Sequence, residues 1–139
     1  MTLVVDASVI AKWFYDEPDT ATARLLLGLD RLLIAPAHAP AEVGHVLARR
    51  VRDGTLTPEA MADAMSGLSR TVVFVPLLGL YAEASRIAVE TGTSFYDALY
   101  VAAAEAWKAD LITADTRLLR GLGSTRWAPV LRALAGWSP

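Results

Sequence analysis

The stretch LVVDAS, residues 3–8, decides how the rest of the chain is interpreted. Three apolar residues run into a single carboxylate, Asp6, and an apolar helical pattern begins at Ser8. This order is typical of a buried strand that ends at an acid. In an open α/β sheet, ligands bind outside the carboxyl ends of the strands. If Asp6 has a chemical role, later parts of the chain are expected to bring further acids to the same edge of the sheet.

Short apolar runs alternate with helical patterns along the rest of the chain. Further strands are expected at residues 31–35, 72–75 and 110–113, with Val130 and Leu131 as candidates for a short fifth strand. Helices are expected at residues 8–15 (capped by Ser8), 20–29, 40–52, 57–70, 80–91, 94–108 and 115–121. Buried strands that alternate with helices form a parallel sheet covered on both faces. We therefore predict an α/β protein, a three-layer α/β/α sandwich with a central parallel sheet of four to five strands, in a single domain over residues 1–139.

Composition excludes several kinds of site. The chain has no cysteine, which excludes disulfides, zinc–thiolate sites and thiol catalysis and fits a reducing cytoplasm. No signal peptide or membrane-spanning run is evident, so we expect a cytoplasmic protein with no membrane contact. The net charge of −2, from 13 basic and 15 acidic residues, differs from the basic character of most nucleic-acid-binding proteins. Setting aside four acids as metal ligands leaves 11 acids and a charge of +2.

Four acids stand out by their positions. Asp6 and Asp115 each follow a predicted strand. Asp97 lies in the first turn of the helix that begins at Ser94, and Glu42 lies early in a helix among apolar neighbours. Each also has a structural explanation, because acids are common as helix N-caps, in capping boxes and near helix N-termini. Four carboxylates at one edge would repel each other unless cations held them, and hard divalent cations take oxygen ligands.

Four blocks of the sequence together resemble a known family. They are VVDASVIAKWF, PAEVGHVL, SFYDALYVAAAE and LITADTRLL. In order and spacing they are similar to the motifs of PIN-domain ribonucleases and, among these, of the VapC-type toxins of bacterial toxin–antitoxin pairs. The resemblance covers residues 3–122. It implies a PIN-like fold and a cytoplasmic endoribonuclease, the toxin of a type II toxin–antitoxin pair.

The resemblance also implies a metal site. The acidic set that binds one or two Mg²⁺ or Mn²⁺ ions and acts in catalysis in this family maps onto Asp6, Glu42, Asp97 and Asp115. The activity implied is hydrolysis of a phosphodiester in single-stranded or looped RNA by an activated water, with no side-chain nucleophile. Ser8 and Thr113 match hydroxyl residues that support the site in the family.

His45 is the one departure from the family pattern, which often has asparagine at this position. It lies three residues after Glu42 and so on about the same helix face. Three interpretations stay open: a structural or surface histidine, a partner that supports Glu42, or a contact to RNA.

Basic residues near the acids are candidates for contact with RNA, because phosphates attract positive charge. Lys12 and Arg117 lie closest in sequence to an acid and are the best candidates. Other candidates are Arg49, Arg50, Arg52, Arg120 and Arg126. The alternative for any of these is a solvated helix face.

Partner surfaces are expected mainly from the resemblance, which implies a VapB-like antitoxin and a homodimer. In this family the early helices help to form the antitoxin groove, and an antitoxin arginine often blocks the acidic site. Here Trp13, Phe14 and Tyr15 form an aromatic run that cannot all face the core from one helix. Either one of them is exposed for a partner, or the three pack under the DEPD segment at residues 16–19.

Other functions explain the acids less well. A haloacid-dehalogenase-like phosphatase needs a second Asp two residues after the first, where this chain has Ser8. A receiver domain has its phosphoacceptor Asp at the end of strand three, and the segment VVFVPL has none. The main alternative is a non-catalytic PIN-like RNA-binding or scaffolding module, which normally goes with loss of the acids.

Overall fold

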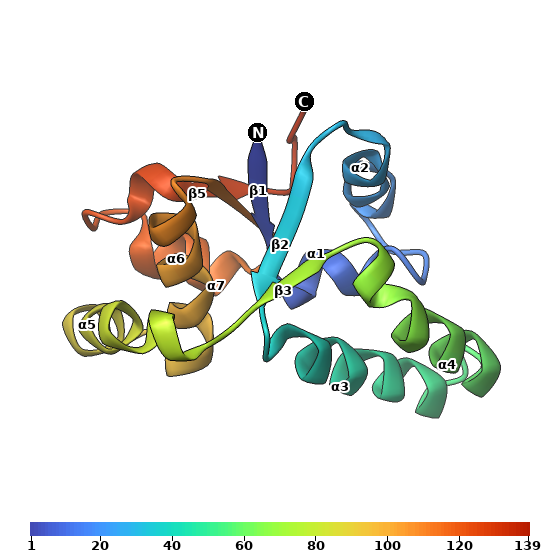
Figure 1. The fold of residues 1–139 in the computed structure, drawn as a ribbon. Helices are drawn as coiled ribbons and strands as arrows, with labels where there is room; N and C mark the ends of the chain where they lie inside the picture. Colours follow the sequence, from blue (N-terminus) through green and yellow to red (C-terminus); the bar gives the residue numbers. More distant parts are fainter.

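A central parallel sheet with helices on both faces makes up the structure, a computed structural model that describes all residues from Met1 to Pro139 (Figure 1). The strands are β1 (Thr2–Val5), β2 (Leu32–Pro36), β3 (Val73–Val75), β4 (Asp110–Thr113) and β5 (Leu131–Ala133). The α-helices are α1 (Ala7–Ala11), α2 (Thr20–Leu25), α3 (Ala39–Arg52), α4 (Pro58–Gly67), α5 (Tyr81–Thr91), α6 (Phe95–Trp107) and α7 (Thr116–Leu122). Short 3-10 turns η1 (Leu26–Gly28), η2 (Leu68–Arg70), η3 (Leu78–Leu80) and η4 (Ala128–Val130) complete the chain.

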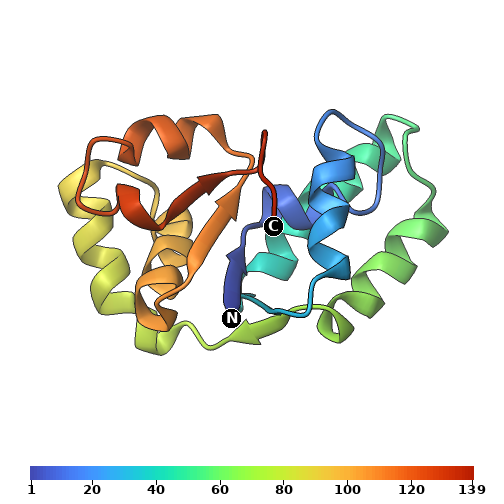
Figure 2. The same cartoon turned by 90° about the horizontal axis from the view of Figure 1, so that it is seen from above.

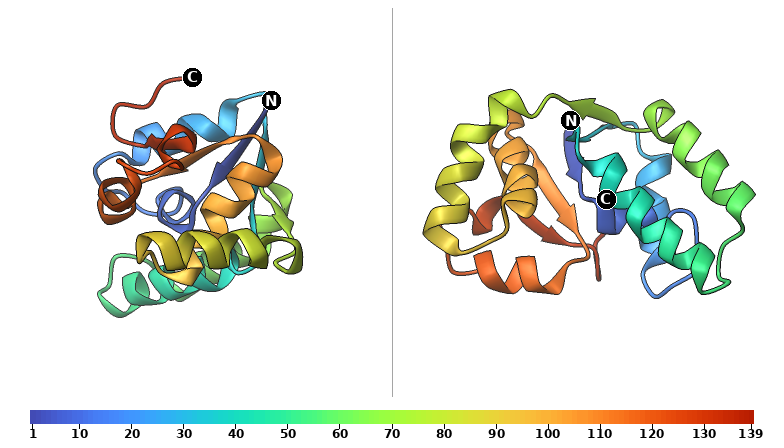
Figure 3. Two further views of the ribbon diagram at one scale, coloured as in Figure 1. Left: turned by 90° about the vertical axis from the view of Figure 1, so that its left-hand side faces the viewer. Right: turned by 90° about the horizontal axis from the view of Figure 1, so that it is seen from below.

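The order of the strands explains how the helices are divided between the two faces. All strands are parallel and lie in the order β3-β2-β1-β4-β5. The chain moves outward from β1 to β3, crosses back to β4, and then continues to β5. Because crossover connections between parallel strands are right-handed, this change of direction puts later helices on the opposite face. Figures 2 and 3 show α1 to α4 grouped on one side of the sheet and α5 to α7 on the other.

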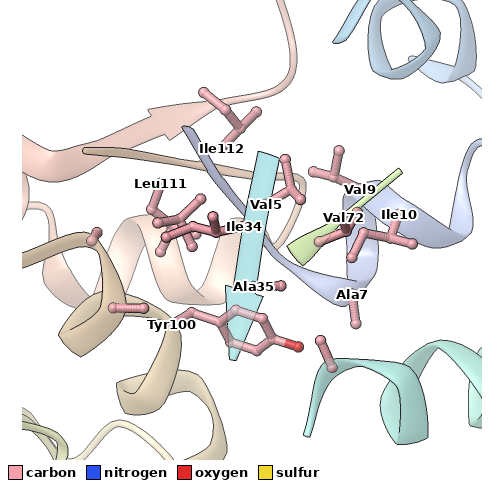
Figure 4. Packing of buried hydrophobic residues seen from close by; sticks show 14 of the residues in the cluster. Val5, Ala7, Val9, Ile10, Ile34, Ala35, Val72, Tyr100, Leu111 and Ile112 are labelled. Carbon is pink, nitrogen blue, oxygen red and sulfur yellow. The ribbon is translucent and has the colours of Figure 1, made fainter. Parts of the chain in front are cut away.

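The core lies on both faces of the three central strands. Val4 is fully buried, and so are Val5, Ile34, Leu111 and Ile112 (Figure 4), as expected for strands covered on both sides. On α6, every residue from 98 to 104 is buried, because this helix packs against both the sheet and α5. The packing fixes the start of α6, and with it Asp97, relative to the strand ends.

The structure confirms the predicted sandwich and its parallel sheet. Most element bounds agree with the predicted ones within a few residues, and the fifth strand begins at Leu131, while Val130 lies in η4. The first helix differs most: it ends at Ala11, and its N-cap is Asp6 rather than Ser8, because the Asp6 carboxylate accepts the Val9 N–H.

The aromatic run lies just beyond the early end of the first helix. Trp13 and Tyr15 are each only 7% exposed, and Phe14 packs partly against the core. Residues two apart point to different sides of a helix, and because α1 ends at Ala11, both rings reach the core from outside the helix. The Trp13 indole N–H donates to the Ala23 carbonyl at 2.9 Å, and the Arg50 guanidinium lies 4.3 Å from the centre of the Tyr15 ring. Trp13 and Tyr15 are therefore buried and Phe14 is partly buried, so none of the three side chains is fully exposed for a partner.

None of the helices has the length and apolar character needed to cross a lipid bilayer.

The C-cap of α5, five residues before Asp97, needs a backbone conformation that favours glycine. Gly92 ends α5 with φ +74°, and nothing lies within 4 Å of the place where a Cβ would be added. We expect Gly92→Ala to lower the free energy of unfolding by about 1–2 kcal/mol through backbone strain alone. Gly121→Ala, inside α7 and equally unobstructed, is the control and should leave it unchanged or raise it by up to about 1 kcal/mol. Urea unfolding of both variants measures this, and equal effects would contradict it.

Candidate active site

The carboxyl ends of β1 and β4 form the point where the sheet changes direction. The connections from β1 lead to β2 on one side, and those from β4 lead to β5 on the other. In open α/β sheets such a switch point is where ligands bind. Asp6 directly follows β1, and Asp115 follows β4 after one intervening residue. Two of the four predicted acids therefore lie side by side at this point of the sheet.

Asp6 is buried, with only 5% of its surface exposed. Its Oδ1 accepts hydrogen bonds from Ser8 Oγ at 2.5 Å and from the Val9 N–H at 3.1 Å, and its Oδ2 accepts one from Thr113 Oγ1. Burial raises the pKa of Asp6 to about 6, and the charge of Asp115 adds to the increase, while the three hydrogen bonds act against it. Asp6 does cap α1, as the structural interpretation proposed, but capping alone does not require a buried carboxylate.

Ser8 and Thr113 connect Asp6 to the end of β4. The Ser8 hydroxyl donates to Asp6 and accepts the Ala114 N–H at 3.1 Å. The Thr113 hydroxyl, fully buried, donates to Asp6 and accepts the Asp115 N–H at 3.0 Å. Each hydroxyl thus joins the buried acid to the backbone that carries the second acid.

Asp115 and Asp97 face the same region from α7 and α6. Asp115 is the N-cap of α7, and its Oδ1 accepts the N–H groups of Arg117 and Leu118 at 2.9 and 3.3 Å. Burial raises the pKa of Asp97, and the negative charges of Asp115 and Glu42 raise it further, while Ser94 and Arg117 lower it. Mutual repulsion therefore links Asp97 to two of the other acids.

A polar cavity of about 330 Å³ opens beside Asp97. Its lining consists of Thr91, Gly92, Thr93, Ser94, Asp97, Arg117, Leu118 and Gly121. Arg117 is the predicted RNA-binding residue that the structure brings to an acid, and its side chain is exposed.

Glu42 is held by two residues that the sequence did not single out. Its Oε1 accepts a hydrogen bond from the Tyr100 hydroxyl at 3.2 Å and lies 2.9 Å from His38 Nε2. Figure 4 shows the Tyr100 hydroxyl pointing out of the core toward the start of α3. Burial raises the pKa of Tyr100 far above its usual value, and the charges of Glu42 and Asp6 add to this, so Tyr100 stays protonated and donates. The sequence signals available were weak: Tyr100 is three residues after Asp97, and His38 is four before Glu42.

His45 and Lys12 make no hydrogen bond or ion pair with the four acids. His45 is exposed, and the histidine that contacts Glu42 is His38. With Ser8, Glu42, Ala7, Ala41 and Val46, His45 lines a second cavity of about 360 Å³. The Lys12 ammonium group binds Glu17 at 2.6 Å and the Pro18 carbonyl at 3.3 Å, so its charge is already paired. Of the two predicted phosphate contacts, only Arg117 is therefore unpaired beside an acid.

The donor set suits a hard divalent cation. All four acids offer only oxygen, and the repulsion that acts on Asp6 and Asp97 is relieved by positive charge. With the side chains as placed, no three His, Asp or Glu residues lie close enough together to hold one metal ion. The oxygen donors and the repulsion between the acids therefore fit such an ion in their chemistry, whereas their side chains are not grouped around one ion.

Comparisons with known proteins show what this chain is similar to. The family profile described as PIN domain matches residues 3–121. Ribonuclease VapC1 of Mycobacterium tuberculosis is 32% identical over 127 residues, 86% of this chain and 90% of that protein. Two solved structures share the fold. One is M. tuberculosis VapC20, a sarcin-ricin loop cleaving toxin, which is 21% identical. The match covers 85% of this chain and 93% of VapC20, with a TM-score of 0.66. The other is a toxin–antitoxin complex from Klebsiella pneumoniae, with 14% identity, 95% and 97% coverage, and a TM-score of 0.65.

The raised pKa of Asp6 predicts how stability depends on pH. Because its folded-state pKa of about 6 lies above the ordinary 3.8, the protonated form favours folding, and this contribution is lost as pH rises through 6. Between pH 4 and pH 8 we expect wild type to lose about 2 kcal/mol of unfolding free energy relative to Asp6→Asn. The exposed substitution Asp63→Asn is the control and should follow wild type. Metal-free urea unfolding at both pH values measures this, and parallel curves for wild type and Asp6→Asn would refute it.

Proposed function

Because the chain belongs to the PIN domain family and, within it, to the VapC-type ribonucleases, we propose that it is a metal-dependent endoribonuclease that hydrolyses phosphodiester bonds of RNA as the toxin of a type II toxin–antitoxin pair. The observation that carries this proposal is the buried Asp6 at the switch point of the sheet, within reach of the charge of Asp115. An ordinary helix cap in this position has no reason to be buried against a second acid.

The metal would be held by the four acids Asp6, Glu42, Asp97 and Asp115. Once bound, a Mg²⁺ or Mn²⁺ ion would supply an activated water and would stabilise the leaving 3′-oxygen. Ser8 and Thr113 donate hydrogen bonds to both oxygens of Asp6 and so favour its charged form in spite of burial. The hydroxyl pair thereby keeps the central ligand ready to bind a cation.

Substrate contacts are proposed on the two sides of the acids. Arg117 lies in the cavity beside Asp97, where its guanidinium can bind the phosphate next to the one that is cleaved. The second cavity, beside Glu42, has an apolar part made by Ala7, Ala41 and Val46, and His45 at its wall can stack on a base. Bases are available for stacking only where RNA is unpaired, which supports single-stranded or looped RNA as the substrate.

Protein partners are proposed in addition to RNA. An antitoxin of the VapB type would insert a basic side chain among the acids, which is the simplest way to neutralise an acidic site. A homodimer is supported by the exposed apolar side chains of Leu78, Tyr81, Phe95 and Tyr96 on η3, α5 and α6.

The alternative, a non-catalytic RNA-binding or scaffolding module, has less support. Such a module has no use for four acids whose negative charges raise the pKa values of Asp6 and Asp97 and repel the phosphates of RNA.

Cleavage of RNA tests the proposal. We expect wild type to cut total cellular RNA with Mg²⁺ or Mn²⁺ and not with EDTA. Asp6→Asn and Asp97→Asn should each lower the cleavage rate by at least about 100-fold, because each removes a carboxylate that holds the cation, and the cation stabilises the charge of the transition state. Asp63→Asn on the exposed face of α4 should cut like wild type. Gel assays of initial rates measure this. Wild-type rates in both site variants would exclude the metal mechanism, and an inactive wild-type protein would favour the scaffolding alternative.

Arg117 is tested by binding without cleavage. In an Asp6→Asn background, we expect Arg117→Gln to weaken single-stranded RNA binding and to reduce the slope of log K against log salt by about 1. Arg70→Gln, an exposed arginine in η2 that does not line the cavity beside Asp97, is the control. Fluorescence anisotropy at several salt concentrations gives both slopes. An unchanged slope for Arg117→Gln would remove Arg117 from the phosphate contacts.

A further inference from the structure

His38 lies outside the predicted acidic set but contacts both helices that carry acids on opposite faces of the sheet. It is the residue that directly precedes α3, and its side chain is 10% exposed. Its Nε2 lies 2.9 Å from Glu42 Oε1 and 3.0 Å from the carbonyl oxygen of Tyr96. Tyr96 is the neighbour of Asp97 in α6. One ring nitrogen thus spans from the Glu42 side chain to the backbone beside Asp97.

The position of the proton on His38 follows from these two neighbours. A carboxylate oxygen and a carbonyl oxygen are both acceptors, so Nε2 carries the hydrogen and donates. The other nitrogen, Nδ1, is buried and has no hydrogen-bond partner. A buried polar atom without a partner is costly, and an apolar ring of the same size would avoid that cost. Unlike an apolar ring, the histidine has an N–H donor, at Nε2, that faces Glu42 and the Tyr96 carbonyl.

Tyr100 supports the same carboxylate oxygen from α6. Its ring lies 4.8 Å from the His38 ring, and its hydroxyl donates to Glu42 Oε1. Glu42 belongs to α3, whereas both Tyr96 and Tyr100 belong to α6. Two donors on one oxygen fix the carboxylate in direction and leave the other oxygen, Oε2, available.

We propose that His38 is a positioning residue that, through Glu42, sets the distance between the carboxylates of Glu42 and Asp97 and so tunes binding of the divalent cation. The inference rests on the proposed function, because it requires that Glu42 is a ligand. His38 itself touches neither the cation nor RNA in this proposal.

Three substitutions separate the donor from the ring. His38→Phe keeps the ring and removes the donor, and His38→Gln keeps an N–H donor at a similar reach. Tyr100→Phe removes only the second donor to the same oxygen. Removing a group that orients a metal ligand typically costs 10–100-fold in metal affinity. We expect Mn²⁺ binding, measured by calorimetry without RNA, to weaken at least about 10-fold in His38→Phe, less in Tyr100→Phe, and to be restored to near wild type in His38→Gln.

A double-mutant cycle shows whether His38 acts through Glu42. In a Glu42→Gln background, where Mn²⁺ binding is already weakened, we expect His38→Phe to cause no further loss, because the ligand that it positions has gone. In RNA cleavage, His38→Phe should lower kcat and leave KM unchanged. Thermal unfolding without metal checks that each variant is folded.

The outcomes are distinguishable. Wild-type Mn²⁺ affinity in folded His38→Phe, an equal loss with and without Glu42, or failure of His38→Gln to restore binding would each overturn the inference and leave the proposed function standing. If His38→Phe does not fold, Tyr100→Phe and His38→Gln carry the test, and wild-type affinity in the first or strongly weakened affinity in the second overturns the inference. A wild-type protein that neither binds Mn²⁺ nor cuts RNA would overturn the proposed function itself.

Discussion

Burial of the Asp6 carboxylate at the end of β1 is the constraint on which the rest of the site depends. A buried acid is unstable in its charged form unless hydrogen bonds or a cation compensate it. Part of the compensation is built into the chain, because the Ser8 and Thr113 hydroxyls donate to its two oxygens. Both hydroxyls also accept backbone N–H groups around the end of β4, so the same contacts that support the acid hold the two central strand ends together. The negative charge of Asp115 still disfavours the ionised form of Asp6. A positive charge nearby would therefore be stabilising.

The strand order brings this unfavourable group to a place where a ligand can reach it. Because β1 and β4 are neighbours and the chain leaves them in opposite directions, no connection covers the space beyond their carboxyl ends. Helices α3 and α6 then supply Glu42 and Asp97 from opposite faces of the sheet. The tight packing of α6, buried over residues 98–104, means that Asp97 is placed by the core rather than by a flexible loop.

Sequence reasoning identified the elements and acids but not the contacts between distant parts of the chain. Strands, caps and acids have local signals: apolar runs, Pro58 at a helix start, and a carboxylate after a strand. The contact of Tyr100 with Glu42 joins residues 58 apart, and no periodicity indicates it. Likewise Lys12 is near Asp6 in sequence, yet the early end of α1 lets it pair with Glu17. The family pattern singles out His45. The histidine that contacts Glu42 is instead His38, which directly precedes α3.

The structural and chemical interpretations of the acids do not exclude each other. Asp6 and Asp115 are both N-caps, and in each case Oδ1 accepts the backbone N–H groups of the following turn. A cap of this kind fixes one oxygen and thereby the direction of the other, which for Asp6 points at Thr113. Glu42 is fixed in a similar way by donors from another helix. Rigid orientation is what an ion with strict coordination geometry requires of its ligands. Capping is a structural explanation for these acids, but it also provides the rigidity that a role in metal binding needs.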